Sequence, residues 1–222
     1  MTKRHLKSFA APKSWPGLLK KEHKHVIKGA PGPHSAELSM PLAQWLRHLR
    51  FGTTKREITH ILNTKQVLID GRRVKEAHFP LGFMDELSLP ELNQNYRILI
   101  DELGKLKAVP SKAKGVKPCK ITGKHVVPGG KTQFNFADGR TILAEKKEYA
   151  VGDTLVLEMP SQKVMKHLKL EKGAKIIITG GKRIGKHGAV ESVHGDKLSF
   201  RRGDEVTETP KEYAYVIEEE FA

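Results

Sequence analysis

The sequence of 222 residues predicts an α+β protein that is predominantly β. A helical spacing of apolar residues is confined to residues 42–62, whereas the chain from residue 96 onward consists of short strand-like runs separated by turns. Hydrophobic residues make up 38% of the chain, which is enough for small packed cores. The length allows one or two ordinary domains, or a few smaller modules with marginal cores of their own.

Two short antiparallel helices joined by a tight turn are expected between residues 41 and 62. Pro41 suits the first position of a helix, and the apolar residues after it recur on one helical face: Leu42, Trp45, Leu46 and Leu49. Gly52 ends this helix. Residues 54–57 form a capping box that begins the second helix, whose inner face carries Ile58, Ile61 and Leu62. Trp45 and Phe83 are predicted to lie in the core. The polar faces then present these candidate binding residues: Arg47, Arg50, Lys55, Arg56 and His60.

A β-hairpin is predicted directly after the helix pair. Asp70-Gly71 separates the apolar run 66–69 from residues 72–74, and this dipeptide is a strong signal for a two-residue hairpin turn. Arg72 and Arg73 follow the turn. The chain order predicts that they lie close to Lys55 and Arg56 and form a concentrated basic surface.

The chain from residue 96 onward is predicted to be almost entirely β. Candidate strands lie at residues 96–100, 132–136, 140–144 and 154–158, with the spacing of a small β-barrel. A strand at 174–179, a second at 189–193 and a turn at 194–196 form a further unit. Between its strands, glycines at 181, 185 and 188 predict a sharp basic turn where the backbone comes close to another group.

The distribution of charge predicts a polyanion as partner. Lys and Arg number 40 against 25 Asp and Glu, which gives +15. Residues 1–28 hold eight Lys/Arg and one acid, residues 105–131 hold eight lysines and no acid, and residues 204–222 carry seven acids and one lysine. A like-charged block without acids is more often an interaction segment than a solvated face. Nucleic acid is therefore the leading partner class.

The N-terminal run has no sustained helical period and predicts an arm that orders on binding. Its candidate RNA contacts are Lys3, Arg4, Lys7 and Lys13. Phe9 and Trp15 are placed to stack on bases or to wedge into a partner's groove.

Several function classes are excluded. A single cysteine, Cys119, allows no intramolecular disulfide and no zinc site with paired thiolates, and it fits a reducing compartment. No apolar run reaches the ~18–20 residues of a membrane span, and the N-terminus lacks the core of a signal peptide, so a soluble intracellular protein is expected. Eleven histidines form no metal motif, and neither a metal nor another cofactor is predicted. Residues 180–186 fit G-x-x-x-x-G-K, the pattern of a phosphate-binding P-loop. His187, however, stands where a P-loop needs Ser or Thr, and no helix is predicted to follow, so nucleotide hydrolysis is not expected.

These segments resemble the ribosomal protein S4e family of the small subunit. The likeness is carried by HLKSFAAPKSW at 5–15, APGPH at 30–34, MPLAQWLR at 40–47 and GFMD at 82–85, and it extends over essentially the whole chain. Residues 38–104 resemble its S4-type RNA-binding module, and residues 172–193 are similar to a KOW motif. Two positions depart from the usual patterns: Met84 precedes Asp85 where glycine is common, and Ala174 follows Gly173 where aspartate is common. The short acidic end suggests an archaeal-type member.

The resemblance implies four parts: a basic arm at 1–37, the S4-type module at 38–104, a central β domain at 105–171, and a KOW-containing SH3-like barrel with an acidic end at 172–222. It implies a non-catalytic constituent of the small ribosomal subunit that binds and helps fold small-subunit rRNA in translation, in the cytoplasm and on the ribosome. Phosphate contacts are expected from the arm, the lysine block and the helix pair. On the glycine turn, Lys182, Arg183 and Lys186 would contact rRNA or a neighbouring ribosomal protein. Neither a membrane nor a small-molecule substrate is expected as a partner.

Two alternatives remain open from the sequence. The first is an RNA-modifying enzyme resembling pseudouridine synthases that uses the S4-type module for targeting. Such an enzyme needs an Arg-x-Asp element in a large catalytic domain, and the only match, at 202–204, falls in a predicted turn. The second is a free RNA chaperone acting in heat-shock or translation control.

Overall fold

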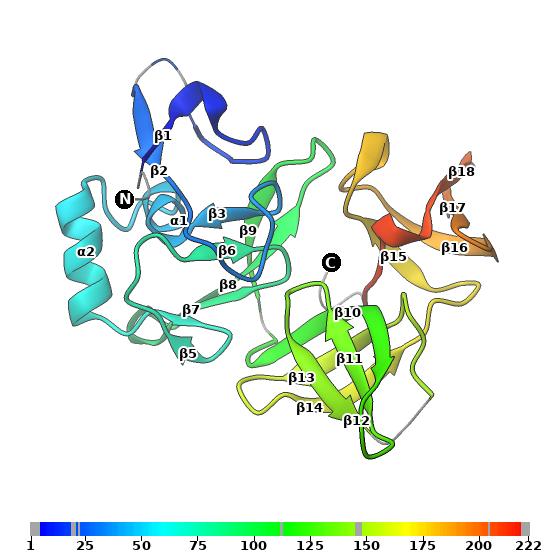
Figure 1. The fold of residues 1–222 in the computed structure, drawn as a ribbon. Coiled ribbons are helices and arrows are strands. Elements are labelled where there is room, and N and C mark those ends of the chain that lie inside the picture. Colours follow the sequence, from blue (N-terminus) through cyan, green and yellow to red (C-terminus); the bar gives the residue numbers. More distant parts are fainter. Residues whose placement is uncertain are drawn as a thin grey trace. The chain divides into compact units, whose positions relative to one another are not determined.

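The computed structural model describes residues 5–18, 21, 23–111, 113–144, 148–203 and 205–218. The chain divides into two compact units. The first contains residues 1–99 and 104–114, and the second contains residues 100–103 and 115–222. Strands predominate in both units, and the two α-helices of the described chain lie in the first (Figure 1). The predicted predominantly β fold is thus confirmed.

The first unit combines the helix pair with three small sheets. The helices are α1 (Leu42–His48) and α2 (Lys55–Thr64). The largest sheet has the order β5-β4-β7-β8-β9 and comprises β4 (Leu68–Ile69), β5 (Arg72–Arg73), β7 (Glu86–Leu89), β8 (Gln94–Ile100) and β9 (Leu106–Pro110). The other pairs are β1 (His5–Lys7) with β2 (His25–Ile27), and β3 (Ser39–Pro41) with β6 (Pro80–Gly82). Two 3₁₀ turns span Ser8–Ala10 and Pro90–Leu92.

The predicted capping box begins α2. The Thr54 hydroxyl accepts a hydrogen bond from the backbone N–H of Glu57 at 3.2 Å, and the Glu57 carboxylate accepts one from the Thr54 N–H at 3.3 Å. The Thr53 N–H also donates to this carboxylate at 2.8 Å. These bonds satisfy amides that the first helical turn leaves without partners. The first helix differs slightly from its prediction, because Pro41 ends β3 and α1 begins one residue later.

The Asp70-Gly71 turn also forms as predicted. Ile69 pairs directly with Arg72, and both turn residues have positive φ values, 48° at Asp70 and 75° at Gly71. Positive φ at both positions is the geometry that matches the twist of a two-residue hairpin. Asp70 is buried, and its Oδ1 accepts the Glu86 N–H at 3.0 Å. The turn is thereby fixed to the neighbouring strand β7.

The helix pair packs its apolar face into the core of the first unit. Trp45 is completely buried, and its Nε1 donates to the Leu81 carbonyl at 3.1 Å. Ile58 and Leu62 of α2 are buried as well, and so is Phe83. The predicted inner faces are confirmed, so the charged residues of α2 are left on the outside.

The N-terminal segment is more structured than the sequence suggests. Trp15, predicted to meet RNA, is only 6% exposed, and its Nε1 donates to the Ser39 carbonyl at 2.8 Å. The described arm also contributes the antiparallel pair β1–β2. The described arm is therefore anchored to the first unit, and the prediction of a base-stacking Trp15 is wrong. Sequence periodicity misses this because the partner carbonyl lies 24 residues away.

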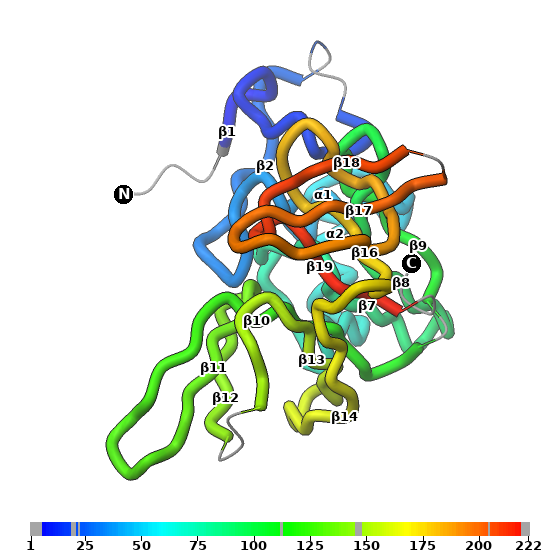
Figure 2. Tube along the Cα trace, turned by 90° about the vertical axis from the view of Figure 1, so that its right-hand side faces the viewer, coloured from blue at the N-terminus to red at the C-terminus, as the bar shows by residue number. Residues whose placement is uncertain are grey.

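The second unit contains two five-stranded sheets. The first has the order β12-β11-β10-β13-β14 and comprises β10 (Val116–Val126), β11 (Thr132–Phe136), β12 (Thr141–Ala144), β13 (Thr154–Glu158) and β14 (Lys163–Leu168). The second has the order β18-β17-β16-β15-β19 and comprises β15 (Lys175–Ile178), β16 (His187–His194), β17 (Lys197–Arg202), β18 (Glu205–Pro210) and β19 (Ala214–Val216). Further 3₁₀ turns lie at Gly181–Arg183 and Lys211–Tyr213. Figure 2 shows β16, β17 and β18 as successive antiparallel passes.

Each sheet of the second unit encloses its own apolar cluster. Phe134, Phe136 and Leu157 belong to the first cluster, and Ile176, Val190 and Phe200 belong to the second. The sheets also contact one another, since the Tyr215 hydroxyl donates to the Pro118 carbonyl at 2.7 Å and is buried. Among the described helices, none has the length and apolar character needed to cross a membrane.

The lysine block at 105–131 is partly a structural feature. Lys117 is buried in β10 and its Nζ lies 3.1 Å from Asp138 Oδ2, which also pairs with Arg140. Lys120 is buried too, and its ammonium donates to the backbone carbonyls of Lys211, at 3.3 Å, and Glu212, at 2.5 Å. These two lysines are inaccessible to phosphate, so the prediction that the whole block contacts RNA is wrong for them. Strand β9, which carries the start of the block, belongs to the sheet of the first unit.

Candidate nucleic-acid interface

The outer face of α2 carries predicted RNA contacts in an exposed position. Lys55, Arg56 and His60 are exposed, while Ile58 and Leu62 on the opposite face are buried. Neither Lys55 nor Arg56 has an ion-pair partner in the described part of the chain. Their charges are therefore available to an external anion.

Arg72 and Arg73 lie on β5, the edge strand that follows the Asp-Gly turn, and both are exposed. Arg73 Nη2 donates to the carbonyl of Asn63 at 3.1 Å and approaches that of Lys65 at 3.5 Å. This contact joins the hairpin to the C-terminal end of α2. The structure therefore joins β5 to the C-terminal end of α2, whereas Lys55 and Arg56 lie in the first turn of that helix. That these four cations form one concentrated basic surface stays a prediction. Arg73 has a structural role in addition to its predicted one.

Two further lysines belong to this region. Lys65 follows α2 and Lys75 follows the hairpin, and both side chains are exposed. They lie outside the predicted helix and strand and carry no motif of their own. Only their position in the sequence, close to the Asp-Gly hairpin, could have indicated that they belong to this basic region. We define the α2–β5 surface by Lys55, Arg56, His60, Lys65, Arg72, Arg73 and Lys75.

Of the two cations predicted at the first helix, Arg47 is less available than expected, whereas Arg50 is exposed. Arg47 is half-buried, its Nη1 lies 3.5 Å from Gln44 Oε1, and its Nε is buried without a partner among the described residues. Arg50 is exposed and adopts a left-handed φ of 62° just after the helix. Burial also lowers the pKa of the neighbouring His48, which favours its neutral form.

Glu57 is the acidic residue within the charged stretch that begins α2. Hydrogen bonds from the backbone of Thr53, then of Thr54, lower the pKa of its carboxyl. The carboxylate is thus held ionised and directed at the amides of its own helix. Its role is to cap α2, while Lys55 and Arg56 remain without an ion-pair partner within the described chain.

The arm presents a smaller basic site. Phe9 is 70% exposed, and the Lys7 ammonium lies 5.6 Å from the centre of its ring. Lys13 is exposed. Lys3 and Arg4 lie outside the described residues, so their predicted contacts stay predictions.

The glycine turn of the second unit approaches its own chain. A Cβ at Gly185 would lie 1.7 Å from the Asp101 carbonyl oxygen, and φ there is +78°. The close approach predicted from the glycines is therefore to backbone of the same unit. On this turn Lys182 is exposed, Lys186 is half-buried, and Arg183 Nη1 donates to the Glu208 carbonyl at 3.0 Å. No group of three or more metal-ligating side chains occurs among the residues that the structure describes.

The fold and the basic faces together define a small, predominantly β protein built around an S4-type module. Models of three protein families match it: the S4 domain at residues 40–87, the RS4NT (NUC023) domain at 2–37, and ribosomal family S4e at 92–164. The chain belongs to the small ribosomal subunit protein eS4 family, as the resemblance implied. Members of this family are structural ribosomal proteins and not enzymes, which removes the hypothesis of an RNA-modifying enzyme.

Similar proteins named small ribosomal subunit protein eS4 occur in several organisms. The one from Methanocaldococcus jannaschii is 38% identical over 98% of this chain and 95% of its own length. The one from Nanoarchaeum equitans is 41% identical over 86% of this chain and 82% of its own. The crystal structure of the 30S ribosomal protein S4e from Thermoplasma acidophilum is similar with a TM-score of 0.68, 26% identity, and coverage of 81% of this chain and 94% of that one.

Proposed function

We propose that this ribosomal protein binds small-subunit rRNA through the α2–β5 surface and helps it fold. The observation that carries the proposal is the set of exposed cations on α2 and β5, within a matched S4 domain. Lys55, Arg56 and Arg72 extend from a helix and a hairpin that belong to the first unit, so the backbone that carries these charges is held in place. Cations on such a surface contact phosphates and read the shape of the RNA more than its base sequence.

Other regions would extend the contact along the RNA. We propose that Lys7 and Lys13 of the arm, with Arg47 and Arg50 after it, add phosphate contacts, and that exposed Phe9 packs against a base. Lys182, Arg183 and Lys186 on the glycine turn would meet rRNA or a neighbouring ribosomal protein. The four-part division at 37/38, 104/105 and 171/172, the KOW character of residues 172–193 and a cytoplasmic location belong to the same proposal.

A triple variant tests the α2–β5 surface directly. K55Q/R56Q/R72Q removes three exposed charges and leaves the buried face of α2 and the hydrogen bonds of Arg73 in place. Affinity for small-subunit rRNA fragments is measured across salt concentrations by filter binding, with circular dichroism to confirm folding. The slope of log K against log salt is expected to fall by roughly 0.7–0.9 for each phosphate that the variant no longer neutralises.

The control is K163Q. Lys163 is exposed on β14, in the second unit, and belongs to none of the proposed contacts. This variant is expected to keep the wild-type slope. A triple variant that binds as the wild type does, at every salt concentration, would contradict the proposal.

A free RNA chaperone remains the competing function. Sedimentation of cell extracts through high-salt gradients separates the two. Stoichiometric migration with small subunits is expected for the ribosomal constituent, whereas a pool released by salt favours the chaperone.

A further inference from the structure

The strands β1 and β2 form a two-stranded ribbon with one covered face and one exposed face (Figure 1). Leu6 lies opposite Val26, which is only 6% exposed, so this row faces inward. Lys7 lies opposite His25 in the next row, and both are exposed. Because successive side chains of a strand point to opposite faces, Lys7 and His25 share the outer face of the ribbon.

Phe9 follows β1 and is 70% exposed, whereas every other Phe, Tyr and Trp that the structure describes is buried or half-buried. The backbone on both sides of it is held in place. The Ser8 N–H donates to the Lys24 carbonyl at 3.0 Å, and the Ala11 N–H donates to the Ser8 carbonyl at 3.3 Å. Ser8 and Ala11 are both buried. An aromatic ring therefore faces solvent from a fixed segment of chain.

Positive charge surrounds this ring. Lys7 Nζ lies over the Phe9 ring, 5.6 Å from its centre, where the electron-rich face attracts a cation. Because the side chain is 70% exposed, the opposite face remains open to a ligand. Lys24 is exposed as well, and its bond to Ser8 places it one residue from Phe9 across the ribbon. A flat ligand that carries negative charge beside it matches this arrangement.

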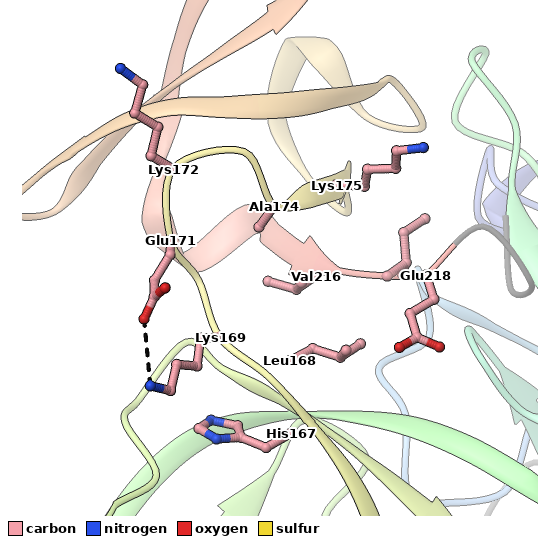
Figure 3. A pocket seen from close by; sticks show the side chains of 10 residues that line it. His167, Leu168, Lys169, Glu171, Lys172, Ala174, Lys175, Val216 and Glu218 are labelled. Carbon is pink, nitrogen blue, oxygen red and sulfur yellow. Dashed lines mark ion pairs between the residues drawn. The ribbon is translucent and has the colours of Figure 1, made fainter.

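A groove in the second unit lacks these features. It has a volume of about 710 Å³ and opens where the linker between β14 and β15 passes β19 (Figure 3). Its lining residues include no Phe, Tyr or Trp, and Val216 and Ile217 are only 4% and 5% exposed. Charges of both signs, such as those of Lys172 and Glu171, stand around it. The groove therefore offers no open face to a flat ligand, whereas Phe9 does.

We propose that Lys7, Phe9 and Lys24, which we name the β1–β2 site, hold one unpaired nucleotide of small-subunit rRNA. Its base stacks on the open face of Phe9, and the adjoining phosphates contact Lys7 and Lys24. A base can stack on a side chain only if its own face is accessible, as in an unpaired nucleotide but not within a duplex. The inference rests on the proposed function and adds to it the unpaired state of the RNA and the contribution of β2.

The charge of the segment favours RNA over the alternative occupant of an exposed aromatic side chain, a groove of another protein. Residues 1–28 carry eight Lys and Arg against one acid. A block of like charge is typical of segments that bind a polyanion.

The first test compares single-stranded and double-stranded RNA as probes. Affinities of the full-length protein for oligouridylate and for an RNA duplex of the same length are measured by filter binding. Phe9→Ala is expected to bind the single strand about tenfold more weakly, since it loses one stacked base, and to bind the duplex unchanged. Leu143→Ala is the control, because Leu143 is an apolar residue of β12 that is 58% exposed and lies outside the proposed contacts. Equal decreases on both probes would overturn the proposal.

The type of side chain at position 9 separates stacking from simple apolar contact. Phe9→Tyr retains an aromatic ring and is expected to keep the affinity for oligouridylate. Phe9→Leu retains apolar volume without a ring and is expected to bind as weakly as Phe9→Ala. These substitutions leave the salt slope unchanged, whereas K7Q/K24Q is expected to reduce it by roughly 0.7 for each phosphate that it no longer neutralises. Full affinity of Phe9→Leu would contradict a stacked base.

Failure of this site is distinct from failure of the proposed function. If Phe9→Ala binds oligouridylate as Leu143→Ala does, while K55Q/R56Q/R72Q binds rRNA fragments weakly, the β1–β2 site is wrong and the α2–β5 surface stands. If neither Phe9→Ala nor K55Q/R56Q/R72Q loses affinity, both proposals fall.

The second test identifies the occupant in assembled small subunits. The photoreactive amino acid p-benzoylphenylalanine replaces Phe9, which keeps an aromatic ring at this position and leaves Lys7 and Lys24 in place. Irradiation is expected to form a crosslink to a nucleotide that is unpaired in the rRNA secondary structure. A crosslink to a ribosomal protein instead, or to paired RNA only, would overturn the proposal.

Discussion

The two units use the same kind of residue in opposite ways. In the first unit Lys55, Arg56 and Arg72 lie on outer faces without ion-pair partners within the described chain. In the second, Lys117 and Lys120 are buried and engaged by Asp138 and by backbone carbonyls. A basic stretch therefore does not by itself indicate an RNA contact. Whether a cation can reach RNA depends on whether its side chain lies on a face of the strand or helix that other parts of the protein cover.

Replacement of Lys117 tests the buried side of this comparison and has the largest expected effect. Lys117→Met leaves Asp138 buried with only Arg140 as an ion-pair partner among the described residues, and removal of one member of a buried pair costs about 3 kcal/mol of unfolding free energy. Hydrogen exchange of the amides in β10 and β13 measures the decrease in the second unit. Lys107→Met, an exposed counterpart, is expected to change stability by less than ~0.5 kcal/mol. Equal losses of unfolding free energy from the two substitutions would contradict the distinction between buried and exposed lysines.

The buried Lys120 makes the stability of the second unit depend on pH. Burial lowers the pKa of its ammonium to about 8, although the charge of Glu212 acts in the opposite direction. Between pH 8 and ~10 the unfolded chain therefore holds more protons at this lysine than the folded chain, so its contribution to stability rises with pH. The gain is expected to be roughly 1–3 kcal/mol relative to Lys120→Met, which lacks the group. Parallel stability curves for the two proteins over this range would contradict the burial of the charge.

Arg73 shares features of both groups of cations, because it is exposed and also hydrogen-bonded to the end of α2. Arg73→Ala is expected to cost about 1 kcal/mol of unfolding free energy, since its hydrogen bonds to Asn63 and Lys65 no longer form. Both tryptophans, Trp15 and Trp45, lie in the first unit, so denaturant unfolding followed by their fluorescence reports this decrease. An unchanged transition midpoint would show that these bonds contribute nothing to stability and leave RNA binding as the role of Arg73.

Arg72 has the smallest expected effect on stability. Arg72→Gln is expected to shift unfolding by less than ~0.5 kcal/mol and to weaken rRNA binding several-fold at low salt. Lys163→Gln, an exposed lysine of β14 outside the proposed contacts, provides the matched control in the same binding assay. Equal decreases in affinity from the two variants would mean that charge acts non-specifically over the protein and not at the α2–β5 surface.

Local signals in the sequence predicted much of the secondary structure. The capping box at Thr54, the Asp70-Gly71 turn and the strands Thr132–Phe136 and Thr154–Glu158 all form where they were expected. Each signal depends on residues within a few positions of one another, whose backbone geometry is set by nearby hydrogen bonds and steric limits. That β5 lies next to α2 could also be predicted, because short connections keep consecutive elements close.

Long-range packing accounts for the predictions that failed. Trp15 becomes a core residue because the Ser39 carbonyl receives its indole N–H. Lys120 is buried because carbonyls 91 and 92 residues further along the chain surround its ammonium. The groove lined by Lys172 and Val216 exists only because β15 pairs with β19 across nearly forty residues of chain. Composition and periodicity contain no information on such partners.

The sequence alone therefore determined the mostly β character, the helix pair and the total positive charge, since these follow from residue types and short-range spacing. The tertiary structure decided which cations face outward, because exposure depends on the strands that cover each side chain. It also decided that Gly185 meets the Asp101 carbonyl and not a ligand, as that approach joins segments more than eighty residues apart.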